Sequence, residues 1–200
     1  TTLILDGLGV RKVKEAPFGV EVLSLRDNRL KTLGAIASCM SLRELSLAGN
    51  RLDESAMAPL AVLPTLRVLD LSRNLMHTLQ PLFPAEAARA GDAFPRLEEL
   101  DVSANPALAD AAPAFSAQRL RVYTAAGLSI TSVRCRPCPS LQVLDFRGCC
   151  LMSVHDVAVL PALRELMLDG NALMTCGGLD AHPHLLDLRL AHNALEDIGP

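Results

Sequence analysis

Apolar residues recur along the chain at a nearly constant spacing. Within residues 163–173 they occupy positions 1, 4, 6 and 11 of an eleven-residue segment, and Asn171 occupies position 9. Residues 185–195 repeat this arrangement, and so do the segments that begin at residues 20, 42 and 66. Because apolar positions 4 and 6 alternate with their neighbours at period two, each segment predicts a short strand that buries one face. The chain is therefore predicted to be an array of repeats, each supplying one strand to a parallel sheet.

Position 9 carries mostly asparagine. In register it reads Leu8, Asn28, Asn50, Asn74, Asn105, Leu128, Cys149, Asn171 and Asn193. After each strand the backbone must turn out of the sheet, and stacked Asn amides can bond the main-chain groups that this turn leaves unpaired. A Cys thiol can replace Asn weakly, whereas Leu cannot. We therefore expect a ladder of six Asn and one Cys, with irregular turns at Leu8 and Leu128.

The segments that return to the sheet carry a second pattern. Five prolines lie two residues before position 1: Pro64, Pro95, Pro139, Pro161 and Pro183. Proline fixes φ and cannot donate to a sheet, so it marks the approach to a strand. Apolar residues at steps of three follow several strands: Leu33 and Ile36; Met76, Leu79 and Leu82; Leu151, Val154 and Val157. These steps predict short helical or 3₁₀ turns on the side opposite the sheet.

The repeated segments resemble the leucine-rich repeat family, whose signature is L-x-x-L-x-L-x-x-N/C-x-L, over nearly the whole chain. The resemblance implies an α/β fold: a right-handed solenoid, or horseshoe, with a parallel sheet on the concave face and short helical or 3₁₀ turns on the convex face. Residues 1–200 would form a single domain of about nine repeats. The short period resembles the subclass of the protein phosphatase-1 regulatory subunit and the axonemal dynein light chain, which is intracellular and binds proteins.

One long interval between repeats and the two ends of the chain differ from the regular repeat pattern. The interval from Asn74 to Asn105 is longer than the others, and the excess, residues 85–92, is a run of helix formers ended by Gly91. We expect a convex-side insertion near residues 80–95, and residues 80–117 are where a surface feature peculiar to this protein is expected outside the sheet. Neither end of the chain shows a polar capping repeat, which predicts that the sequence is a fragment of a longer protein.

Positions 3 and 5 of the repeats are predicted to line the concave face in columns. Together these columns hold seven acids and one base. They are Glu44, Asp70, Glu99, Asp101, Asp145, Glu165, Asp187 and Arg189. Like charges on neighbouring strands repel, so this stripe, dotted with Val, is interpreted as a binding surface for a protein segment bearing Lys or Arg. The alternative is that the acids only solvate the sheet. Arginines at position 2, namely Arg43, Arg67, Arg121 and Arg164, are placed to neutralise them from the edge.

Net charge, apolar runs and cysteine content limit the class of partner and the cellular compartment that we expect. The formal net charge is −3, which argues against nucleic acid as a partner. No apolar run approaches the ~20 residues needed to cross a bilayer, and the first residues do not form a secretory signal, so no membrane association is expected. The six cysteines show no paired clusters flanking the repeats. They are interpreted as reduced, and the protein as cytoplasmic, with association with the cytoskeleton or cilium as a further expectation.

Candidate chemistry is sparse. Cys135 and Cys138 have the C-x-x-C spacing of a redox pair or half a zinc site, but they lie on a return segment and the only near candidates for further ligands are Cys149 and Cys150. His182 and His184 could form half a metal site but fall where surface turns are expected. The sequence contains no G-x-S-x-G, phosphate-binding loop or H-E-x-x-H motif. No catalytic residue, metal or cofactor is therefore assigned.

These observations predict a non-catalytic protein-interaction module, scaffold or regulatory subunit that binds a protein partner on its concave face. The family resemblance offers a phosphatase or a cytoskeletal or axonemal component as that partner. One alternative is the substrate-recognition repeat region of a larger enzyme, such as a ligase, whose catalytic domain lies outside this chain. A further alternative is zinc binding at Cys135 and Cys138.

Overall fold

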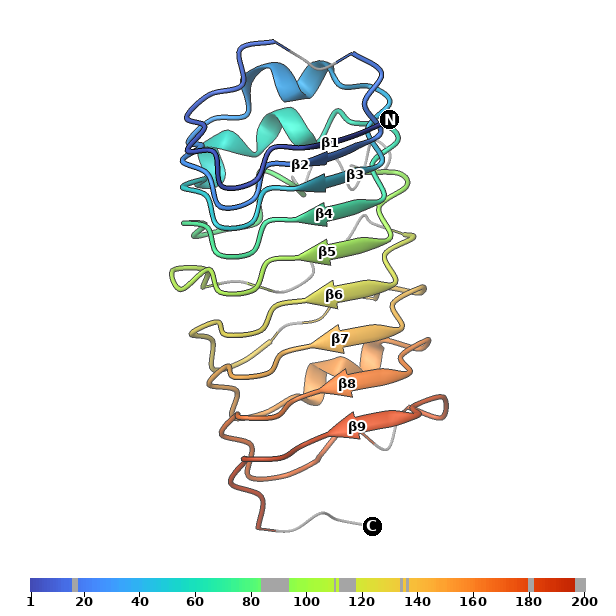
Figure 1. Ribbon diagram of the computed structural model, residues 1–200. Coiled ribbons are helices and arrows are strands. Elements are labelled where there is room, and N and C mark those ends of the chain that lie inside the picture. Colours follow the sequence, from blue (N-terminus) through green and yellow to red (C-terminus); the bar gives the residue numbers. More distant parts are fainter. Residues whose placement is uncertain are drawn as a thin grey trace.

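The computed structural model describes residues 1–15, 18–83, 94–109, 111, 118–133, 135, 137–179 and 182–196. Its strands are β1 (Thr2–Ile4), β2 (Val22–Ser24), β3 (Glu44–Ser46), β4 (Val68–Asp70), β5 (Glu99–Asp101), β6 (Val122–Thr124), β7 (Val143–Asp145), β8 (Glu165–Met167) and β9 (Asp187–Arg189). They form one parallel sheet in sequence order. Figure 1 shows these strands stacked like rungs, with the return segments behind them. The predicted solenoid is confirmed.

Alternation along each strand builds the core. The middle residue of a strand points inward, and Leu45, Leu69 and Leu144 at this position are no more than 1% exposed. Positions 1, 6 and 11 add further buried side chains, so the core is a continuous column between neighbouring repeats. Full burial of such a side chain contributes about 1.5–3 kcal/mol. The stack of repeats, rather than any single repeat, therefore holds the fold together.

An asparagine ladder closes the turns after the strands, as predicted. The Asn74 side chain shows the pattern: its Oδ1 accepts from the Leu52 N–H at 3.0 Å, and its Nδ2 donates to the Leu47 and Leu71 carbonyls at 3.0 Å each. The other five ladder asparagines bond the equivalent groups. The Cys149 thiol donates to the Ala125 carbonyl at 3.3 Å.

The prediction of irregular turns at Leu8 and Leu128 is wrong. The residue before position 9 has a positive φ in every repeat, including Gly7 at 68° and Gly127 at 68°. The N–H of Gly127 donates to the Arg147 carbonyl at 2.8 Å, and Gly7 makes the same bond to the next repeat. Glycine adopts this left-handed conformation without steric cost, so the turn keeps its shape where the Asn amide is missing.

The convex side carries 3₁₀ helices η1 (Gly34–Ser38), η2 (Glu54–Ala56), η3 (Ala58–Leu60) and η4 (His155–Val159). Two of the three predicted apolar steps coincide with η1 and η4. Residues 77–82 instead form bends, an isolated bridge at Thr78 and a turn, although Met76, Leu79 and Leu82 are buried. All five prolines lie in turns before strands, as predicted.

The predicted convex-side insertion near residues 80–95 falls largely outside the described residues, because residues 84–93 are not described. Phe83 and Phe94, on either side of it, are buried with ring centroids 5.8 Å apart. Strand β5 still pairs with β4 in register, with Leu69 opposite Leu100. In the described part of the chain, no helix has the length and apolar character that a membrane span requires.

Candidate functional site

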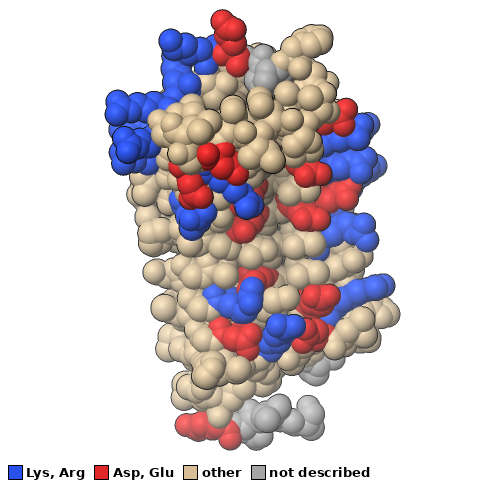
Figure 2. Space-filling view, in the orientation of Figure 1, with Lys and Arg blue, Asp and Glu red and all other residues tan. Residues whose placement is uncertain are grey.

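The concave face displays the predicted columns of side chains. Parallel pairing places position 3 of each strand opposite position 3 of the next, and the same holds for position 5. All eight residues proposed for this surface therefore lie in the two columns: Glu44, Asp70, Glu99, Asp101, Asp145, Glu165, Asp187 and Arg189. Figure 2 views this face and shows acidic and basic side chains together along the middle of the sheet. The surface is thus less uniformly acidic than the two columns alone suggest.

Asp70 is the most elaborately bonded of these acids. Its Oδ2 accepts from Arg26 Nη2 at 2.7 Å and from Ser46 Oγ at 2.9 Å, and its Oδ1 accepts from Ser72 Oγ at 2.7 Å. Only 9% of the residue is exposed. Burial raises the pKa of Asp70, but the hydrogen bonds from Ser72, Ser46 and Arg26 outweigh it, so the net pKa is lowered. Asp70 is therefore a charged residue that the protein itself satisfies.

Two further acids are neutralised by arginines two residues along the chain. Arg147 Nη2 donates to Asp145 Oδ2 at 2.6 Å, and Arg147 Nε lies 3.0 Å from each carboxylate oxygen. The hydrogen bond and charge of Asp145 raise the pKa of the Arg147 guanidinium. Arg189 Nη2 donates to Asp187 Oδ2 at 2.9 Å. These pairs leave little net charge at β7 and β9.

Asp101 is different. Its Oδ1 accepts from the Ser103 N–H at 2.8 Å, and among the described residues no basic side chain forms an ion pair with it. Burial raises the pKa of Asp101; the Ser103 hydrogen bonds oppose this, while the charges of Asp70 and Asp145 raise it further. The net shift is upward. Asp101 is thus an acid whose charged form the folded protein disfavours.

A hollow on the concave face, here called the central acidic pocket, surrounds this residue. It has a volume of about 220 Å³ over β4, β5 and β6. Its lining consists of Arg26, Val68, Leu69, Asp70, Glu99, Leu100, Asp101, Val122 and Thr124. Glu99 lies between Val68 and Val122 in the position-3 column and has no ion pair with any described residue. The pocket therefore combines two acids without ion-pair partners, Glu99 and Asp101, with two aliphatic walls.

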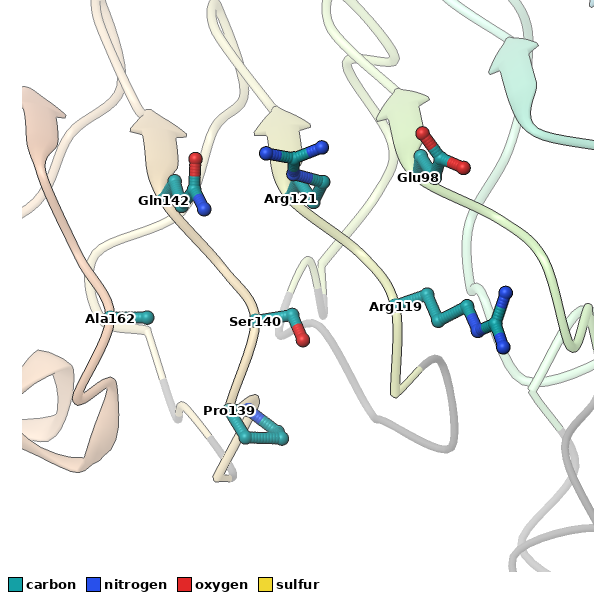
Figure 3. A pocket seen from close by; sticks show the side chains of 7 residues that line it. All are labelled: Glu98, Arg119, Arg121, Pro139, Ser140, Gln142 and Ala162. Carbon is teal, nitrogen blue, oxygen red and sulfur yellow. The ribbon is translucent and has the colours of Figure 1, made fainter.

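Arginines at position 2 do not neutralise the concave acids in the way considered above. Arg43 pairs with Glu21 at 3.5 Å and Arg67 pairs with Glu98 at 3.7 Å, so these ion pairs run along position 2 itself. The same edge carries a second hollow of about 420 Å³, the edge pocket, lined by Glu98, Arg119, Arg121, Pro139, Ser140, Gln142 and Ala162. Figure 3 shows Arg121, Glu98 and Gln142 where their strands begin. The edge pocket is therefore lined by both acidic and basic side chains.

Two of the three arginines that neutralise concave acids, Arg26 and Arg147, were missed by the sequence analysis, which named only Arg189. Both occupy position 7 of a repeat. Period-two alternation continues from positions 3 and 5 to position 7, so this column also faces the concave side. Reading a third column would have placed both residues on the concave face, although not beside a particular acid.

Among the residues that the structure describes, the cysteines and histidines do not come together in a group of three metal ligands. Burial, with the charges of Asp156 and Cys138, raises the pKa of the Cys135 thiol to about 12. Burial also raises the pKa of Cys138, so burial favours the protonated form of both thiols. His182 is buried while His184 is exposed, so the two do not face one site. Within the described ranges, no group of three His, Cys, Asp or Glu is placed to hold a metal ion.

The stacked parallel strands, the position-9 ladder and the short 3₁₀ returns define the class: the chain is a leucine-rich repeat protein with repeats of about 22 residues. A leucine-rich repeat family model matches residues 38–61 and 181–199. The chain is 31% identical over 173 residues to the Tonsoku-like protein of Danio rerio, covering 84% of this chain and 10% of that protein. It is 30% identical over 184 residues to Tsukushi-A of Xenopus laevis, covering 84% of this chain and 50% of that protein. The chain thus spans half or less of these relatives.

Solved structures share the fold. An internalin, inlF, of Listeria monocytogenes superposes with a TM-score of 0.70 at 21% identity, over 90% of this chain and 50% of that one. The leucine-rich repeat ectodomain of the plant membrane receptor kinase GASSHO1/SCHENGEN3 from Arabidopsis thaliana, in complex with CASPARIAN STRIP INTEGRITY FACTOR 2, superposes with a TM-score of 0.64 at 21% identity, over 88% of this chain and 22% of that one.

Proposed function

We propose that this leucine-rich repeat domain is a non-catalytic protein-interaction module that binds a Lys- or Arg-bearing protein segment on its concave face. Leucine-rich repeat domains are, as a class, protein-interaction modules. The receptor ectodomain above, whose structure was solved in complex with CASPARIAN STRIP INTEGRITY FACTOR 2, is one example of the fold holding a ligand. The observation that carries the proposal for this chain is the central acidic pocket.

The chemistry of this pocket suits a long cationic side chain. Lys and Arg have an aliphatic stem and a charged head, and they bury the stem against apolar surface while the head reaches a polar group. Val68 and Val122 offer apolar walls on either side of Glu99. Asp101, on the same strand as Glu99, faces the same pocket. A bound cation would therefore meet two carboxylates that lack an ion-pair partner among the described residues.

Electrostatics gives this pocket a reason to bind. Asp101 lies in one column with Asp70 and Asp145, and burial and both charges raise its pKa. A cation placed beside Asp101 would offset the repulsion from Asp70 and Asp145 and stabilise the charged form of Asp101. This stabilisation favours binding of the cation. Asp70 and Asp145 offer less, because Arg26 and Arg147 already satisfy them. The contact is therefore assigned first to Glu99 and Asp101, with Glu44 and Glu165 extending it along position 3.

Binding of synthetic peptides tests this assignment. An array of short peptides would carry Lys, Arg, acetyl-lysine or Glu at one central position in an otherwise identical neutral sequence. Lys and Arg peptides are expected to bind, while acetyl-lysine and Glu peptides are not. Asp101→Asn or Glu99→Gln should each weaken the bound peptides about tenfold, because a hydrogen bond to a charged group contributes about 1.5–3 kcal/mol.

Asp187→Asn is the matched control. It removes one carboxylate charge from the same sheet face, but from an acid that Arg189 already neutralises, so peptide binding should change by less than about twofold. Equal binding of Lys and Glu peptides, or an equal loss in Asp187→Asn and Asp101→Asn, would show that the central acidic pocket is not the contact.

We further propose that the protein works in the cytoplasm with reduced thiols. No disulfide joins any two of the six cysteines, and the Cys149 thiol serves as a ladder donor to the Ala125 carbonyl. The resemblance to short intracellular repeats favours a phosphatase or a cytoskeletal or axonemal component as the partner. Affinity capture from native lysate with the wild type and with Asp101→Asn would test the assignment of the partner. Partners of another class, or the same set retained by both proteins, would count against it.

A further inference from the structure

We propose that the first three repeats carry an anion site for a phosphorylated Ser or Thr side chain of a partner protein, separate from the concave face. The site is a hollow of about 400 Å³, here called the basic pocket, lined by Arg11, Arg29, Lys31 and Arg51. All four side chains are exposed. In Figure 2 basic side chains gather at the upper left edge of the molecule, where Figure 1 places the turns that leave the first strands.

Ladder hydrogen bonds fix the backbone that carries these residues. The N–H of Val10 donates to Asn28 Oδ1 at 2.8 Å, and the Val10 carbonyl accepts from the Arg29 N–H at 2.8 Å. One repeat further on, Leu30 is held in the same way between Asn50 and Arg51. The segments that bear Arg11, Arg29, Lys31 and Arg51 are therefore side by side on a rigid edge. Such placement favours binding because little order has to be gained on contact.

The charges in the basic pocket have no counterion among the residues that the structure describes. Six other arginines of the chain form ion pairs with Asp or Glu: Arg26, Arg43, Arg67, Arg73, Arg147 and Arg189. None of the four residues of the basic pocket has such a pair with any described residue. Arg29 and Arg51 occupy the same position of adjacent repeats, about 4.8 Å apart in backbone spacing, so their charges repel. An anion between them would remove this repulsion.

The form of the pocket favours one compact anion. A phosphorylated side chain carries about −1.5 to −2 charges on three acceptor oxygens, which can receive several guanidinium N–H groups at once. A single carboxylate carries one negative charge, about half to two thirds of that, and only two acceptor oxygens. A long polyanion such as nucleic acid would extend past the pocket toward the acids of the concave face, and no aromatic residue lines the pocket to stack on a base. A phosphorylated protein segment therefore fits this edge best.

Two measurements test the site. In the first, NMR follows the Arg Nε–Hε resonances while inorganic phosphate replaces chloride at constant ionic strength. Those of Arg11, Arg29 and Arg51 are expected to shift, and those of Arg119 and Arg121 are not. In the second, fluorescence anisotropy compares a short labelled peptide containing phosphoserine with the same peptide containing Ser or Glu. The affinity for the phosphoserine peptide should exceed that for the Glu peptide by about tenfold or more.

The variants use a matched pair of sites. Arg29→Gln with Arg51→Gln should weaken the phosphoserine peptide about tenfold or more. Arg119→Gln with Arg121→Gln removes the same charge from the edge pocket and should change the affinity by less than about twofold. No shift with phosphate, equal loss in both double variants, or tighter binding of single-stranded RNA than of the phosphopeptide would each overturn the proposal. An affinity for the phosphopeptide no higher than that for inorganic phosphate would exclude a peptide as the occupant.

Discussion

Replacing Asn74 by Ala tests how much of the stability depends on the ladder. The amide is 2% exposed and bonds groups from two repeats. Without it, the buried Leu52 N–H loses its bond to Oδ1, which costs about 1–3 kcal/mol. The Leu47 and Leu71 carbonyls lose less, because Asn50 and Asn105 still donate to them; about 0.5–1.5 kcal/mol is expected for each. The free energy of unfolding should therefore fall by about 2–6 kcal/mol.

Equilibrium unfolding in urea, followed by far-UV circular dichroism, measures this loss. Asn193→Ala is the matched control, since the same three kinds of bond are made there by an amide that is only half buried. Water can replace the amide at that site, so its loss should be clearly smaller. Asn74→Cys should fall between wild type and Asn74→Ala, because the Cys149 thiol shows that a sulfur can donate to one of these carbonyls. If Asn74→Ala lost less than about 0.5 kcal/mol, backbone bonds and packing would have to carry the turns without the amides.

Three further outcomes are expected. Because the pKa of Asp70 is lowered, its charge stabilises the fold above the ordinary Asp pKa, and this effect is lost as the pH falls through the lowered value. Asp70→Asn should therefore destabilise the protein at pH 7, and by less as the pH is lowered. Asp101 has a raised pKa, so Asp101→Asn should stabilise the protein at pH 7; urea unfolding over a series of pH values checks both variants. Gly127→Ala should cost about 1 kcal/mol in the same assay, since φ is +68° there; no loss would mean that the turn relaxes. Cys135, with a pKa of about 12, should react with iodoacetamide at pH 8 far more slowly than the exposed Cys150, as judged by mass spectrometry; equal rates would contradict its burial.

Most of the fold can be predicted from the sequence because the repeats share one pattern of apolar and Asn positions. Strand position, parallel register and the ladder follow from the spacing of Leu and Asn alone. The turns at Leu8 and Leu128 were mispredicted because the prediction assumed that the turn depends on the Asn amide at position 9. Gly7 and Gly127, one residue earlier, hold the left-handed conformation without it. A local backbone preference thus replaces a missing side-chain bond.

The concave surface was only partly readable. The sequence placed the acids in two columns, but the net charge there depends on which acids are paired, and pairing depends on how far an arginine side chain reaches. Arg26 reaches Asp70 two strands away, a contact that joins residues 44 apart in sequence. Simple periodicity identifies the column of Arg26 but not its partner. The distinction between Asp70, which has an ion pair, and Asp101, which has none with any described residue, therefore appears only in three dimensions.

The contact between Phe83 and Phe94 has a consequence for how this architecture tolerates change. With their rings 5.8 Å apart, the chain leaves and rejoins the stack at nearly one point, and the next strand continues in register. Phe83 and Phe94 are thus held together by the core itself, and the register of β4 and β5 does not depend on the length of the connection between them. Evolution or an engineer can lengthen, shorten or replace that connection, for instance with a reporter domain, while the repeats on either side keep their alignment.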